Sequence, residues 1–266
     1  MTTLGIADAL NEHYNSQART EALTGPWRPR PSALGGCLRE IAFRLEEKVP
    51  IEPRSSESMR VLELGTQRGE MLELHCKAIW PDAEVQVPLK IPWPGGFMEG
   101  TCDLWIPSLR TIVDFKTAGA YTMGLLLAGE KEDEGYALQL NGYRHGVLHR
   151  LGWSQAPKIP CDWKGPDGIR TILVYEAKDS DARKGVTAGM LVEQEISYTE
   201  ELETRYQFRL TALHALIEDH KRGALNPFSV PSMPRDSKGN PHWKCKLSKT
   251  GRPLYCSIGP INGQCG

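Results

Sequence analysis

Residues 100–116 read GTCDLWIPSLRTIVDFK, in which two runs of β-prone residues flank a short turn. If the turn is centred between Ser108 and Leu109, antiparallel pairing sets Asp103 opposite Asp114, with their Cβ atoms about 5 Å apart. Lys116 follows Asp114 by two residues and therefore projects from the same side of its strand. The stretch predicts a hairpin with two acids and a lysine on one face.

The opposite face of this hairpin is apolar, as a half-buried sheet requires; it carries Leu104, Ile106, Val113 and Phe115. Two carboxylates placed opposite each other repel, and a divalent cation would compensate them. Such a metal activates water at a phosphate, and a nearby lysine stabilises the charge that develops. The alternative is an exposed acidic pair with Lys116 as its ion-pair partner, because D-x-K triplets are common.

The elements around the hairpin are read from periodicity and cap residues. A weak helix precedes the Pro/Arg stretch at 25–31. The further expectations are a helix capped by Ser32 that carries Leu34, Leu38, Ile41, Ala42 and Leu45; a helix over 58–80 with Met71, Leu74, His75, Ala78 and Ile79 on one face; strands at 85–91, 97–106, 111–116 and 171–177; a helix over 133–151; and a helix to about 220 opened by a Ser197–Glu200 capping box. This order predicts an α/β fold with a mixed central sheet flanked by helices.

The bulk composition is that of an ordinary globular protein, with 40% hydrophobic and 24% charged residues among 266. No apolar run approaches the roughly 18 residues of a membrane helix, and the N-terminus lacks the features of a signal peptide. We therefore expect a cytoplasmic protein, bacterial or in the host cytoplasm if phage-encoded, with no membrane partner. The net charge is −1, but residues 221–266 hold eight Lys/Arg against one acid. That tail either attracts a polyanion or is simply solvated.

Polar residues outside the hairpin each have two interpretations. His75 is a metal ligand or a core histidine on a helix face. Gln139 and Tyr143 share a helix face by their i, i+4 spacing, and they support the site or form a polar patch. Arg39 and Arg44 contact phosphate or are solvated.

The ordered set His75, G-x-x-Asp103, Asp114-x-Lys116 and Gln139-x-x-x-Tyr143 resembles the RecB-type branch of the PD-(D/E)xK nucleases over about residues 32–180. The resemblance implies a restriction-endonuclease-like core and a site for Mg²⁺ or Mn²⁺. The ligands would be His75, Asp103, Asp114 and the Phe115 carbonyl. Lys116 would be catalytic, supported by Gln139 and Tyr143.

The activity that this resemblance implies is metal-dependent hydrolysis of phosphodiester bonds at DNA ends, by an exonuclease rather than an endonuclease. The settings are recombination, repair, phage DNA processing or CRISPR adaptation, with DNA, a homo-oligomer or a recombination or adaptation protein as partners. The alternative is a DNA-end-binding or assembly subunit that has the nuclease fold but little activity.

Cysteines flank these motifs, with Cys37 before the first of them and Cys245, Cys256 and Cys265 after the last. This distribution resembles the iron–sulfur nucleases of the same branch, such as AddB and Cas-four, in which four thiolates hold a 4Fe–4S cluster. The late cysteines are spaced C-x10-C and C-x8-C, without the C-x-x-C pair of those families. Structural zinc and free thiols are the alternatives. The expected organisation is an N-terminal extension (1–31), a nuclease core (32–222) and a basic cysteine-containing segment (223–266) that packs back on Cys37.

Overall fold

The computed structural model describes residues 6–23, 27–46, 55–130, 134–152 and 168–230. The chain divides into two compact units. One holds Pro29–Gly35 and Leu64–Thr211, and the other holds Met1–Arg28, Gly36–Glu63 and Ala212–Gly266. The expected boundaries at 1–31, 32–222 and 223–266 stay predictions.

A five-stranded sheet forms the centre of the first unit, in the spatial order β1-β2-β3-β4-β5. The strands are β1 (Glu84–Trp93), β2 (Gly96–Ile106), β3 (Thr111–Ala118), β4 (Arg170–Ala177) and β5 (Leu191–Glu195). β3 and β4 are parallel, and the other neighbouring pairs are antiparallel. The predicted α/β core with a mixed central sheet is confirmed.

The predicted hairpin register is confirmed, because β2 and β3 pair Leu104 with Val113 and Ile106 with Thr111. A 3-10 turn over Pro107–Leu109 joins the strands. Arg110 closes this turn at φ 47°, in the left-handed region. Proline fixes the start of the turn, so the register is set locally.

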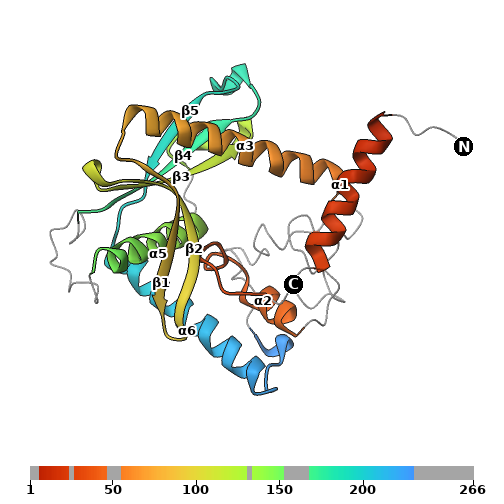
Figure 1. Cartoon of the computed structure of the whole chain (residues 1–266), viewed down its shortest axis with the longest axis vertical. Helices are drawn as coiled ribbons and strands as arrows, with labels where there is room; N and C mark the ends of the chain where they lie inside the picture. Colours follow the sequence, from red (N-terminus) through yellow and green to blue (C-terminus); the bar gives the residue numbers. More distant parts are fainter. Residues whose placement is uncertain (1–5, 24–26, 47–54, 131–133, 153–167, 231–266) are drawn as a thin grey trace, which may run out of the picture. The chain divides into compact units, whose positions relative to one another are not determined.

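Helices cover both sides of the sheet. α3 (Ser56–Ile79) lies on one side and α5 (Glu134–Arg150) on the other, as Figure 1 shows. The apolar side of the hairpin contacts α3, in a cluster of Ala83, Leu104, Ile106 and Val113 joined by Cys76, Trp80, Val85, Phe115 and Val174. The division of the hairpin into an apolar and an acidic face therefore follows from which helix covers each side.

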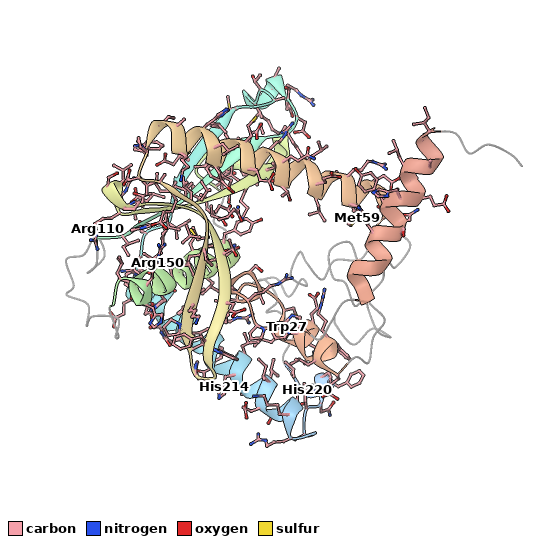
Figure 2. The ribbon with its side chains drawn as sticks, in the orientation of Figure 1. Trp27, Met59, Arg110, Arg150, His214 and His220 are labelled. Carbon is pink, nitrogen blue, oxygen red and sulfur yellow. The ribbon has the colours of Figure 1, made fainter. Side chains whose placement is uncertain are left out.

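α5 approaches β1 so closely that a glycine is needed between them. A Cβ atom at Gly146 would lie 2.9 Å from both Ile91 Cγ1 and Leu89 Cβ. At the C-terminal end of α5, Arg150 forms an ion pair with Glu84 at 2.7 Å; Figure 2 labels this arginine. The first half of α6 (Glu200–Lys221) is joined to α5 by Glu203, which accepts from Asn141 at 2.9 Å.

Two predicted helix starts are wrong. Ser32 lies in a 3-10 turn (Pro31–Ala33), and α2 (Leu38–Leu45) begins after Cys37, because Gly35 and Gly36 interrupt the pattern. Thr199, not Ser197, caps α6 by accepting from the Leu202 N–H at 3.0 Å. Ser197 comes too early because the Ile196 N–H still bonds to Thr171 at the sheet.

Two elements were not predicted from the sequence. α4 (Ala120–Leu127) follows β3 directly, and β5 pairs with β4 at the sheet edge. α4 has no polar face, and β5 alternates only weakly between exposed and half-buried positions. Neither segment carries the periodic signal that amphipathic elements show.

The second unit has its own apolar cluster, of Ala42, Leu216, Leu225 and Val230 with Leu38 and Leu45 against it. α1 (Ile6–Leu23) contacts the start of α3, where Tyr14 donates to Glu63 at 2.6 Å. No helix in the described ranges is both long and apolar enough to cross a membrane.

Gly146→Ala is expected to destabilise the protein by about 1–3 kcal/mol, because the added methyl overpacks the contact between α5 and β1. The midpoint of urea unfolding measures the change. Gly69→Ala in α3 is the matched control, since a Cβ there would meet only Phe115 Cβ, at 4.0 Å. That variant should be neutral or gain up to about 1 kcal/mol from helix propensity. Equal effects of the two variants would contradict the close packing of α5.

Candidate active site

The site begins where β2 and β3 separate. Their ladder ends at Leu104 and Val113, so Asp103 and Asp114 follow at the point of divergence. On the other side of β2, the ladder with β1 is interrupted at Gln86, which has φ 48°. β1 and β2 curl away from the rest of the sheet (Figure 1). The Asp103 side chain takes the place of the missing ladder bond, and its Oδ2 accepts from the Phe115 N–H at 2.9 Å.

Asp114 and Lys116 form a largely buried ion pair on β3. The Lys116 ammonium contacts Asp114 Oδ2, and Asp114 is only 1% exposed. Burial raises the pKa of Asp114 to about 6, against the lowering effect of Lys116 and with a further increase from Asp103. Burial also raises the pKa of Asp103. The pKa of Lys116 is raised, because its carboxylate neighbours outweigh the cost of burial.

α5 covers this ion pair with three polar side chains. Gln139 Nε2 reaches both Asp114 Oδ1, at 3.3 Å, and the Tyr143 hydroxyl, at 2.8 Å. Burial raises the pKa of Tyr143, and the charge of Asp114 adds to the effect. One turn earlier, the Tyr136 ring lies under the ammonium of Lys116, 4.9 Å from its centroid. These contacts hold the lysine and the buried aspartate in one geometry.

Glu73 on α3 is a further carboxylate at the site, and sequence reasoning missed it. It is 4% exposed and accepts from Gln86 Nε2 at 2.6 Å, next to the divergence of the strands. Burial raises its pKa, and Asp103 raises it further. The signal in the sequence was the spacing of Glu73 and Cys76, which lie on one side of the helix, with Trp80 directly after its last residue.

The face of α3 that the apolar periodicity identifies is not the face that packs on the sheet. The face with Met71, Leu74, His75, Ala78 and Ile79 is exposed. His75 follows Glu73 by two residues, so it points away from the sheet when Glu73 points toward it. The structure does not bring His75 to the aspartates. Tertiary packing selected the narrower stripe that contains Cys76 and Trp80.

The remaining predicted residues lie elsewhere. Arg39 and Arg44 belong to the other unit, where Arg39 donates to the Val230 carbonyl at 2.6 Å and Arg44 pairs with Glu40 at 2.9 Å. Cys37 is buried there, at the start of α2. Cys245, Cys256 and Cys265 lie outside the described residues. The DNA-contact and cluster roles thus stay predictions.

The carboxylates of the site suit a cation whose coordination shell is completed by other ligands. Asp103, Asp114 and Glu73 place negative charge in a region that burial makes unfavourable for it. Among the described residues, no group of three or more His, Cys, Asp or Glu side chains converges tightly enough to hold a metal by itself. Mg²⁺ commonly uses one or two carboxylates, with water and phosphate oxygens in its other positions. The residues present fit that mode.

No family model and no curated protein matches the sequence. Among solved structures, a phage-related exonuclease from Haemophilus somnus 129PT is similar, with 14% identity, 75% of this chain and 97% of that chain covered, and a TM-score of 0.45. An alkaline exonuclease from Laribacter hongkongensis gives 14% identity, 80% and 97% coverage, and a TM-score of 0.41. The protein SSO0001 gives 18% identity, 82% and 87% coverage, and a TM-score of 0.45. No TM-score reaches 0.5, so we infer function from the site itself.

In EDTA at neutral pH, Asp103→Asn is expected to increase the free energy of unfolding, on the order of 1 kcal/mol, because it removes one crowded carboxylate charge. The asparagine oxygen still accepts from Phe115. A raised pKa means that the ionised form is disfavoured in the folded state, so the gain should disappear as the pH falls below about 4. Urea unfolding at both pH values measures this.

Asp82→Asn is the control with the opposite sign. Asp82 accepts two bonds from Ser108, at 2.7 and 3.1 Å, and these bonds lower its pKa. Its ionised form is therefore favoured in the folded state, and the variant should lose stability at neutral pH. A loss of stability in both variants would contradict the repulsion inferred at Asp103.

Proposed function

We propose that the protein is a divalent-metal-dependent DNA nuclease that hydrolyses phosphodiester bonds at DNA ends. The observation that carries the proposal is the buried Asp114–Lys116 ion pair beside Asp103, at the point where β2 leaves β3. A purely structural ion pair has no need of a second crowded aspartate, which costs stability. Paired acids with a lysine are suited to phosphodiester hydrolysis.

We assign the following roles to the residues of the site. Asp103, Asp114 and the Phe115 carbonyl would hold Mg²⁺ or Mn²⁺, with Glu73 adding negative charge nearby. A bound metal ion would activate water and stabilise charge on the phosphate. With Asp114 serving as a metal ligand, the Lys116 ammonium beside it would be available to the water or to the phosphate oxygens. The Tyr136 ring would keep the ammonium in place, and Gln139 would orient Asp114.

The biological settings that we propose are recombination, repair, phage DNA processing or CRISPR adaptation in the cytoplasm. Arg39 and Arg44 would contribute phosphate contacts. The sequence pattern also supports a 4Fe–4S cluster on Cys37, Cys245, Cys256 and Cys265, with zinc as the alternative. Iron, sulfide and zinc analysis of the purified protein separates these, and absence of all three refutes both.

The test is cleavage of end-labelled linear DNA and covalently closed circular DNA, with Mn²⁺, with Mg²⁺ or with EDTA. Lys116→Ala is expected to lower the rate about 100-fold or more, since it removes an electrostatic contact to the transition state. Lys90→Ala is the matched control, because Lys90 is exposed on β1 of the same sheet. It should cleave like the wild type.

Degradation of linear DNA alone, by the wild type with metal, supports an exonuclease. Cutting of circles assigns an endonuclease to the same residues. If the wild type binds linear DNA ends and cuts nothing with either metal, the proposal fails, and a DNA-end-binding subunit replaces it. Equal rates for Lys116→Ala and Lys90→Ala would remove Lys116 from the mechanism.

A further inference from the structure

An exposed aromatic ring follows immediately after the strand that carries Lys116. Tyr121 lies in the first turn of α4 and is 67% exposed. The helix is anchored from its other side by Met123, which is fully buried, and by Ala120. The ring is therefore held outward by a fixed backbone, at the carboxyl end of β3. Open α/β sheets bind their ligands at this end of parallel strands.

A lysine from the turn that follows the neighbouring parallel strand lies against this ring. Lys184 belongs to the 3-10 turn (Ala182–Lys184) that follows β4, and its Nζ is 4.7 Å from the Tyr121 ring centroid. Its stem crosses α4 at Gly124, where an added Cβ would lie 2.9 Å from Lys184 Cδ. Gly124 thus leaves room for the lysine to reach the ring. We call these two residues the Tyr121–Lys184 platform.

The charges around the platform favour an anionic partner. Arg183 is 93% exposed at its side chain, and Lys178 is also exposed. The two nearby acids are occupied by backbone contacts: Asp181 accepts from the Arg183 N–H at 3.1 Å, and Asp179 accepts from the Ala120 N–H. Asp181 also pairs with Lys184 and with the Arg183 side chain, at 3.6 Å in each case. The three exposed cations, Lys178, Arg183 and Lys184, outnumber these two acids, so the net charge beside the ring is positive.

We propose that the Tyr121–Lys184 platform binds a single strand of DNA beside the cleavage site, with a base stacked on Tyr121 and phosphates held by Lys184 and Arg183. Aromatic stacking combined with cations along the backbone is the general mode of single-strand binding. A duplex hides the faces of its bases, so an exposed ring offers it little. This inference rests on the proposed nuclease function and specifies the form of DNA at that site.

The experiment is fluorescence anisotropy of a labelled oligothymidine in EDTA, so that binding is measured without cleavage. Tyr121→Ala is expected to weaken binding about 5- to 100-fold, and Tyr121→Phe should bind like the wild type because the ring face is kept. Lys184→Gln should lower the salt dependence of binding by about one phosphate contact. Phe208→Ala is the control, since Phe208 is an equally exposed aromatic residue (69%) on α6.

An abasic strand of the same length separates stacking from charge, because the effect of Tyr121→Ala should vanish on it. Wild-type binding for Tyr121→Ala, or an equal loss for Phe208→Ala, overturns the platform and leaves the nuclease proposal standing. Single-strand binding that needs Tyr121, in a protein that cuts nothing with Mn²⁺, supports the platform while the nuclease proposal fails. Absence of binding by the wild type overturns the platform. Circular dichroism and urea unfolding of each variant exclude loss of the fold as the cause.

Discussion

The site depends on one unfavourable arrangement, a carboxylate buried at the centre of a sheet with a second carboxylate next to it. Asp114 is almost inaccessible to water, and Asp103 is held close by the Phe115 N–H. Charge in such a place is stable only with partners. Lys116 supplies one of them, and Gln139 orients the other oxygen of Asp114. The rest of the unit keeps these groups from relaxing apart.

Both sides of the sheet contribute to that restraint. On one side, α3 packs Cys76 and Trp80 on the apolar face of the hairpin and thereby brings in Glu73. On the other side, α5 lies against β1 at Gly146. This close packing sets the distance of Gln139, Tyr136 and Tyr143 from β3. Neither helix makes the site by itself. The distortion at Gln86 and the end of the β2–β3 ladder leave the space in which the charged groups meet.

The hairpin was predictable because its information is local. Alternation with period two, a proline at the turn and a short connection together allow one register, and that register sets Asp103 and Asp114 at facing positions with Lys116 on the same side. The fold class followed from the order of such segments. The helix cap at Ser32 failed for a local reason as well, since two glycines interrupt the helical pattern.

The rotation of α3 could not be read from the sequence, because the helix carries two competing stripes. The stripe with Met71, Leu74 and Ile79 is the more hydrophobic, yet it is exposed, whereas Glu73 is buried and Cys76 packs on the sheet. Helical periodicity identifies the stripe with the most apolar residues. It does not take account of a carboxylate that accepts a hydrogen bond from a neighbouring strand. Gln86 donates that hydrogen bond from the position where β1 is distorted. The buried acid thus marks where tertiary contacts outweighed hydrophobicity in setting the rotation of the helix.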